Sequence, residues 1–339
     1  MAADSKLQTA PIENQQHHGD SVFPYVVKSP VPEAGFDQVL PWVAEHRDEL
    51  LQLSTIHGAI LFRDMPIPSI EAFDAFIEAL SMPNFPYLES LSNAVRVNHT
   101  ERVFTANEAP PDVQILFHHE MAQTPLFPGR ILFYCEVAAD EGGATPICRS
   151  DVLYERLKAS CPQFIKACET KGLTYTNVMP DADDPGSGMG RSWSSTLGAN
   201  SRQQAESQLH QLGYSWEWLG DGCLKMTTPP LPAVMQATRQ RKTFFNQIIA
   251  AYFGWKDDRN DPSQAIRHAD GSKIDAEGAQ QAMRIAEELE YAVPWQPGDV
   301  VLIDNTMVMH GRHSFQGTRK VYASLADKRT QSFSSSSLG

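Results

Sequence analysis

Two apolar segments that lie far apart in the sequence each lead into residues that commonly bind metals, and this most constrains how the chain can fold. The first segment, Val113–Phe117, is followed by the tripeptide His118–Glu120, which reads His-His-Glu. The second, Val300–Asn305, leads to His310. Short apolar runs of this kind are typical of buried strands. If these polar side chains share one site, the two strands lie close together and the region between them is an insertion.

The remaining elements support this layout, with strands toward both ends of the chain and helices in the middle. Ser69 is a candidate N-cap for one helix, and Gly172 is a candidate stop for another. The expected strands are His57–Arg63, Val113–Phe117, Ile131–Cys135 and Trp295–Asp304, and the expected helices are Glu45–Ser54, Ile70–Leu80, Ser150–Glu169, Gln203–Leu212 and Asp275–Leu289. Antiparallel strands that close on themselves around inserted helices indicate a mainly β (α+β) fold with a double-stranded β-helix, or jelly-roll, core.

We expect one domain over residues 21–330, with a helical insertion at about 150–290. Residues 1–20 are polar, and residues 331–339 contain four consecutive serines. Both segments are predicted to be disordered tails. The chain has no apolar run long enough to cross a membrane, so no membrane span is predicted.

Charge and cysteine content narrow the partners and the compartment. The 339 residues carry a formal net charge of -13, which argues against a nucleic acid or an anionic membrane as the main partner. The five cysteines form no C-x-x-C pair and are odd in number. Free thiols in a reducing cytoplasm are therefore expected. Nothing in the sequence predicts the oligomeric state.

Two imidazoles and one carboxylate form the facial triad of non-haem Fe(II) oxygenases, which leaves metal positions open. His118 and Glu120 would point to the same face of an extended strand, whereas His119 would point to the opposite face and pack there. Arg319 follows His310 at a position suited to bind the far carboxylate of a 2-oxo diacid. The Thr145 hydroxyl, after a glycine pair, can also hydrogen-bond a carboxylate. Taken alone, each of these residues is more often an ordinary polar group.

Several ordered motifs together resemble the taurine dioxygenase (TauD/TfdA) superfamily, and most closely its SyrP-like branch. The resemblance extends from about Ile60 to Lys328. Its motifs are F-H-H-E-M at Phe117–Met121, G-G-A-T-P-I at Gly142–Ile147, W-E-W-L at Trp216–Leu219, F-F-N-Q at Phe244–Gln247, D-G-S at Asp270–Ser272, and W-Q-P-G-D-V-V-L-I-D-N…H-G-R…F-x-G-x-R at Trp295–Arg319.

The resemblance implies Fe(II) bound by His118, Glu120 and His310, with O₂ and 2-oxoglutarate as cosubstrates. It implies that Arg319 and Thr145 hold 2-oxoglutarate. Arg312 and Asn246 resemble pocket residues of this branch that bind substrate. His119 stands where the family usually has asparagine, so it is a further candidate for the substrate wall.

The reaction implied by the resemblance is hydroxylation of an unactivated C–H bond in an amino acid or an amino-acid-derived small molecule, in a biosynthetic or catabolic pathway. Glu120 argues against halogenation, because halogenating relatives replace the acidic ligand with a small residue. Desaturation or cyclisation of a carrier-tethered or peptide substrate stays open, so a carrier protein is a further candidate partner. Two other classes also stay open. These are a zinc-dependent hydrolase, because zinc uses the same ligand set, and a non-catalytic binding module on the same fold.

Overall fold

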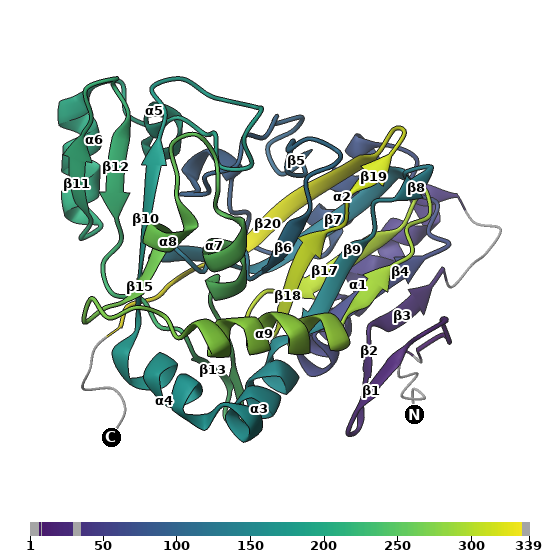
Figure 1. The fold of residues 1–339 in the computed structure, drawn as a ribbon. Coiled ribbons are helices and arrows are strands. Elements are labelled where there is room, and N and C mark those ends of the chain that lie inside the picture. The colour runs from purple at the N-terminus through teal and green to yellow at the C-terminus, as the bar shows by residue number, and fades with distance from the viewer. Residues whose placement is uncertain (1–6, 8, 30–34, 334–339) are drawn as a thin grey trace.

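The computed structural model describes residue 7 and residues 9–29 and 35–333. Two sheets packed face to face form its core (Figure 1). One sheet has six strands in the order β3-β4-β17-β7-β20-β5, and the other has four in the order β16-β9-β18-β6. The strands are β3 (Tyr25–Lys28), β4 (Ala59–Arg63), β5 (Phe104–Thr105), β6 (Ile115–His118), β7 (Leu126–Val137), β9 (Thr145–Arg149), β16 (Tyr291–Val293), β17 (Val300–Asp304), β18 (Val308–Arg312) and β20 (Lys320–Thr330). The predicted mainly β fold with a jelly-roll core is confirmed.

The central strands are apolar on both faces because both faces are covered. Leu61 of β4 packs with Phe133 of β7 in the cluster between the two sheets. Its neighbour Phe62 points the other way, toward helices α1 (Phe36–His57) and α2 (Ile70–Ala79). Alternation along a strand therefore sends successive side chains into two different apolar layers, which explains the continuous apolar runs in the sequence.

The helix predictions are mostly confirmed, and their caps explain why. Ser69 caps α2 by accepting a hydrogen bond from the main-chain N–H of Ala72. Helix α1 begins earlier than expected, at Phe36, and continues through Pro41. In the described part of the chain, no helix is long and apolar enough to cross a membrane.

The predicted helix Ser150–Glu169 is two helices, α3 (Ser150–Ser160) and α4 (Pro162–Lys171). Pro162 causes the break, because a proline moves the residue before it away from helical geometry. Cys161 accordingly has φ −134° and ψ 61°, and Pro162 takes the first position of the second helix.

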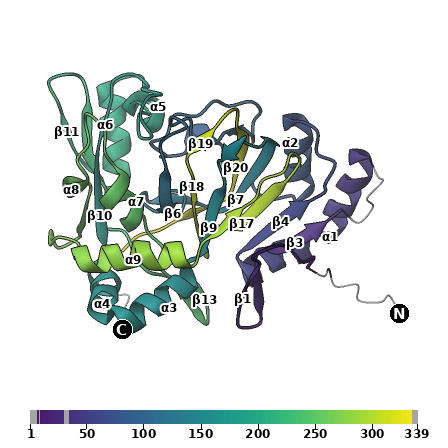
Figure 2. The same cartoon turned by 45° about the vertical axis from the view of Figure 1, so that its right-hand side comes forward.

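The region between β9 and β16, where a helical insertion was expected, is not only helical. It also contains a second four-stranded sheet, in the order β11-β12-β10-β15, and the β13-β14 hairpin. Its strands are β10 (Leu173–Met179), β11 (Ser215–Trp218), β12 (Leu224–Thr227), β13 (Met235–Thr238), β14 (Arg241–Thr243) and β15 (Ile266–His268), and its further helices are α5 (Trp193–Leu197), α6 (Arg202–Gln211), α7 (Ile248–Gly254), α8 (Pro262–Ala265) and α9 (Ala276–Glu288). The insertion lies on one side of the jelly roll, and α1 and α2 lie on the other (Figure 2).

Both predicted tails are wrong where the structure describes them. Strands β1 (Gln16–His18) and β2 (Ser21–Phe23) form a hairpin, and the Gln16 side chain donates to the main chain of Glu290 at 2.8 Å. At the other end, the Gln331 side chain donates to two main-chain carbonyls, at 3.0 and 2.8 Å. Hydrogen bonds to the body hold these segments, which polar composition alone did not indicate. Residues 1–6, 8 and 334–339 lie outside the described residues, and the single domain over 21–330 stays a prediction.

Candidate active site

The structure brings His118, Glu120 and His310 together at the β6 edge of the sheet with the order β16-β9-β18-β6. His118 is the last residue of β6, and His310 lies directly across from it on β18. The Nε2 atoms of His118 and His310 lie 4.0 and 3.5 Å from the Glu120 carboxylate. One candidate ligand atom from each of the three residues lies within 4.8 Å of the others. The two segments that the sequence pointed to therefore converge on one point.

Glu120 reaches this point through a turn, not by the strand alternation that we expected. Strand β6 ends at His118, and Met121 has a positive φ of 57°. Asn305 fixes the turn from the other segment, because its side chain accepts from the N–H of Glu120 at 2.8 Å and donates to the Glu120 carbonyl at 2.9 Å. His118 and Glu120 thus lie close together as expected, but a turn brings them together instead of strand alternation.

The protonation of these residues suits metal binding. The Nδ1 atom of His118 lies 2.8 Å from the Leu116 carbonyl, which can only accept, so Nδ1 carries the proton and the Nε2 lone pair faces the cluster. Burial, and secondarily the charge of His310, lowers the pKa of His118 to about 4. Burial alone would raise the pKa of Glu120, but Arg96 and the two histidines outweigh it and lower that pKa. Two imidazoles and a carboxylate are the donor set for a divalent transition metal with open positions, so the residues fit an Fe(II) ion.

Arg319 and Thr145 lie together beside this cluster, as the sequence predicted. The Arg319 guanidinium donates to the Gly143 carbonyl at 2.8 Å and to the Thr145 hydroxyl at 3.3 Å. Both side chains line a small cavity that also reaches His118 and His310. Burial lowers the pKa of Arg319 to about 10, so the group is still a cation at neutral pH.

A larger cavity of about 490 Å³ opens from the cluster toward the insertion. Its lining includes His118, Glu120 and Arg96, together with Gln123 and Gln247. The amide of Gln247 donates to the side-chain oxygen of Gln123 and, at 3.0 Å, to the His119 carbonyl. These two amides therefore form a fixed polar wall.

Of the three residues expected to bind substrate, Arg312 borders the small cavity, whereas His119 and Asn246 line neither cavity. His119 is fully buried between the Asn305 carbonyl and the Ser150 hydroxyl, at 2.5 and 2.9 Å. Asn246 is also fully buried, and its side chain bonds only main-chain groups of the insertion. The terminal nitrogens of Arg312 donate to four main-chain carbonyls, so they hold a loop.

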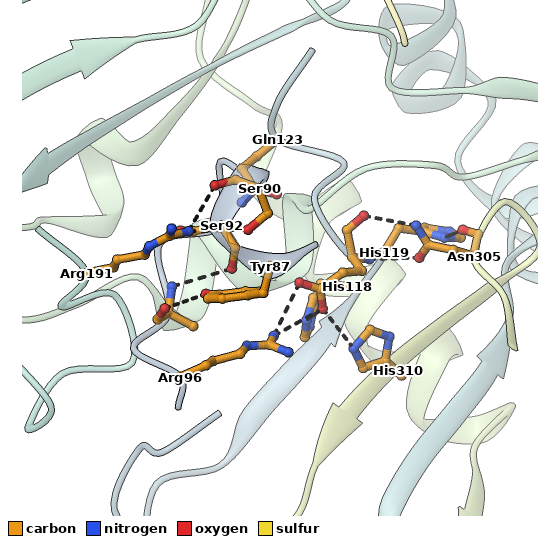
Figure 3. A network of polar contacts seen from close by, with 12 residues as sticks. Tyr87, Ser90, Ser92, Arg96, His118, His119, Gln123, Arg191, Asn305 and His310 are labelled. Carbon is orange, nitrogen blue, oxygen red and sulfur yellow. Dashed lines mark hydrogen bonds and ion pairs between the residues drawn. The ribbon is translucent and has the colours of Figure 1, made fainter. Parts of the chain in front are cut away.

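Sequence reasoning missed two residues of the cavity, Arg96 and Gln247. Gln247 belongs to the predicted F-F-N-Q motif, one position beyond the residue that was chosen. Arg96 stands in a polar segment with no motif around it, and no signal in the sequence could have separated it from a surface arginine. Figure 3 shows Arg96 beside Tyr87, on the side of the cluster away from His119 and Asn305.

Comparison with known proteins shows the family to which this chain belongs. The sequence model of the "taurine catabolism dioxygenase TauD, TfdA family" matches residues 24–325. A clavaminate synthase-like protein of Arabidopsis thaliana is 42% identical over 332 residues, which cover 95% of this chain and 99% of that protein. The dapdiamide synthesis protein DdaC of Enterobacter agglomerans is 26% identical over 283 residues, 80% of this chain and 82% of that protein.

The fold is also shared with solved structures. PvcB of Pseudomonas aeruginosa superposes with a TM-score of 0.54 over 96% of this chain and 93% of that chain. The sequence identity is 12%, so this likeness concerns the fold alone.

Proposed function

The chain belongs to the TauD/TfdA family of Fe(II)- and 2-oxoglutarate-dependent dioxygenases, and from this premise we propose that it hydroxylates an unactivated C–H bond of an amino acid or an amino-acid-derived small molecule. Its cofactors are Fe(II), 2-oxoglutarate and O₂. The observation that carries the proposal is the convergence of His118, Glu120 and His310 next to the cavity of Arg319 and Thr145.

Each residue has a distinct task in this reaction. His118 and His310 would hold the metal through imidazole nitrogens, and Glu120 would hold it through a carboxylate oxygen. Arg319 binds the far carboxylate of 2-oxoglutarate as a planar fork, and the Thr145 hydroxyl supports it. When bound, iron with 2-oxoglutarate and O₂ supplies the oxidising power, with succinate and CO₂ released. The protein contributes positioning, because an oriented C–H bond reacts far faster than a free one.

The larger cavity supports a small polar substrate. It offers the Arg96 cation near the metal ligands and the Gln123–Gln247 amides on the wall. The relative DdaC is named for the synthesis of dapdiamide, which supports a biosynthetic role. All five cysteines are free thiols, which supports our proposal that the enzyme works in the cytoplasm.

A screen of amino acids and their derivatives tests the proposal. Succinate release and oxygen uptake are measured in air and anaerobically with Fe(II) supplied, and the product is identified by mass spectrometry. We expect equal amounts of succinate and hydroxylated product, formed only in air. His310→Ala should lower turnover by about a thousandfold or more, because the metal loses a ligand.

The rival zinc hydrolase makes the opposite prediction. It would act anaerobically, would be restored by Zn(II) and would form no succinate. Succinate release in His310→Ala at the wild-type rate would contradict the oxygenase.

A further inference from the structure

Arg96 is a buried cation whose hydrogen-bonding capacity is mostly unused. Its side chain is only 6% exposed. One terminal nitrogen, Nη2, lies 3.3 and 3.4 Å from the two oxygens of Glu120, which is long for a charge-assisted bond. Nε and Nη1 have no hydrogen-bond partner among the described residues. A buried charge this poorly satisfied is costly unless a further anion binds it.

Aromatic rings hold the guanidinium in place without using its donors. Its central carbon lies 5.1 Å from the centroid of the Tyr87 ring and 5.3 Å from that of Phe104. The Tyr87 hydroxyl is fixed on the Ala94 carbonyl at 2.5 Å. The cation is therefore oriented in advance at a position that borders both the large cavity and the small one beside Arg319, and Figure 3 shows it beside Tyr87.

Among the described residues, Arg130, Arg259 and Arg312 each have one buried nitrogen without a partner, whereas Arg96 has two. All three guanidinium nitrogens of Arg191 have partners, at the Ser195 hydroxyl, the Ser90 carbonyl and the Ser195 carbonyl. Arg191 thus supports the loop that follows Tyr87, whereas Arg96 borders the cavity with most of its donors unpaired. The contact with Glu120 does not satisfy the charge of Arg96, because a metal cation bound by Glu120 would repel the guanidinium.

We propose that Arg96 binds the carboxylate of the primary substrate, and so selects carboxylic acids whose reacting carbon lies close to that carboxylate. The inference rests on the proposed function and specifies its substrate class. The carboxylates of 2-oxoglutarate already have partners in the metal site and in Arg319. The planar fork of an arginine matches a carboxylate in two parallel bonds, which a neutral amide cannot reproduce.

The test compares acids with their amides on anaerobic enzyme loaded with Fe(II) and 2-oxoglutarate. The probes are the twenty common L-amino acids and their α-carboxamides. Binding is read from the thermal shift and from the change that each probe causes in the visible charge-transfer band of the Fe(II)–2-oxoglutarate chelate. Arg96→Gln removes the cation, Arg96→Lys keeps the charge without the fork, and Arg102→Gln removes a partly exposed arginine that pairs with Asp74 away from the cavity.

We expect at least one acid to bind while its amide does not. Arg96→Gln should weaken that acid by about thirtyfold or more, Arg96→Lys by less, and Arg102→Gln not at all. The chelate band should titrate with 2-oxoglutarate equally in all four proteins, which also shows that the variants are folded.

Three results would overturn the inference. The first is that acids and amides bind alike or not at all, and the second is that Arg96→Gln keeps the wild-type affinity for the acid. The third is that Arg96→Gln loses 2-oxoglutarate instead, which would make Arg96 a cosubstrate residue. Failure of the wild-type protein to form the chelate would contradict the proposed function and not this inference. In that case, acid binding measured by thermal shift still tests whether Arg96 binds a carboxylate.

Discussion

Asn305 links the two segments that carry the metal ligands. Its side chain bonds both main-chain groups of Glu120 and also donates to the Pro128 carbonyl at 2.8 Å, and the residue is fully buried. The side chain therefore sets the path of the turn that presents the carboxylate. We regard it as a positioning residue, because it lies behind the ligand.

Asn305→Ala should weaken both folding and metal binding. It leaves buried main-chain groups without partners, which should cost about 3 kcal/mol in the free energy of unfolding. Metal affinity should fall by roughly tenfold to a hundredfold, since the carboxylate is no longer held in place. Denaturant unfolding and metal titration by calorimetry measure the two effects. Asn84→Ala, at a partly buried site whose amide bonds the Glu101 carbonyl, is the control. Unchanged metal affinity in folded Asn305→Ala protein would contradict this role.

Arg319→Lys should raise the KM for 2-oxoglutarate by about tenfold, because a lysine cannot form the two parallel bonds of the guanidinium. The KM for the primary substrate should change little, since Arg319 borders the small cavity and not the large one. Steady-state kinetics with each compound varied in turn separate the two constants. A rise in KM for the primary substrate alone would mean that Arg319 binds the primary substrate and Arg96 binds 2-oxoglutarate.

At the scale of single residues, the sequence predicted residues whose role follows from their type and spacing. It missed residues whose role depends on where the fold places them. A histidine after an apolar run is recognisable, and so is the arginine nine positions behind it. Arg96 owes its role to Tyr87 and Phe104, which no local pattern connects to it. For His119 the expectation of a packed side chain agrees with its full burial, whereas the alternative expectation of a place in the substrate wall does not, because it lines neither cavity.

Local signals determine helices more completely than strands. Ser69, Ser201 and Asp275 each cap a helix by accepting from a main-chain N–H, and the three helices that they begin were all expected. The sheet in the insertion was not expected, because β10 pairs with β12 and β15 across long stretches of sequence. Such pairing depends on neighbours that the sequence does not show locally.

Ser69→Ala should lower the free energy of unfolding by about 1 kcal/mol, because the N-terminus of α2 loses its capping oxygen. Ser69→Asp should restore most of this stability, since aspartate caps equally well. Helix α2 covers the sheet face that points away from the metal ligands, so the 2-oxoglutarate affinity should be the same in all three proteins. Denaturant titration measures the stability, and a loss in Ser69→Asp equal to that in Ser69→Ala would show that capping is not the cause.

Across the whole molecule, charge is distributed unevenly. The chain carries a net charge of -13, yet its candidate active site places the arginines Arg96 and Arg319 beside His118 and His310. An acidic protein can therefore still recognise anionic small molecules, and net charge alone could not reveal this. The jelly roll could be predicted because its strands are recognisable as apolar runs in the sequence. The cavity could not, because it depends on how the insertion packs against these strands.

The buried histidines should make the metal-free protein unstable in acid. Burial lowers the pKa of His118 to about 4 and that of His119 to about 3, below the usual value of about 6.5 that an unfolded chain has. Between pH 6.5 and 4 the unfolded state thus binds protons that the folded state does not. Stability is complete above pH 6.5 and is lost as the pH falls through this window, by about 1.4 kcal/mol per pH unit for each histidine.

Other histidines modify this dependence of the free energy of unfolding on pH. Burial also lowers the pKa of His57 and His268, which adds to the loss. Glu290 raises the pKa of His313, which opposes it because that group stabilises the fold when protonated. Lowering the pH from 7.5 to 5 should therefore cost the metal-free protein about 4 kcal/mol from His118 and His119 alone, measured by denaturant unfolding at each pH. His119→Asn removes one of the two groups and should roughly halve this contribution, whatever its effect on stability at pH 7.5. A wild-type stability that stays level between pH 7 and 5 would show that the buried imidazoles gain protons without unfolding.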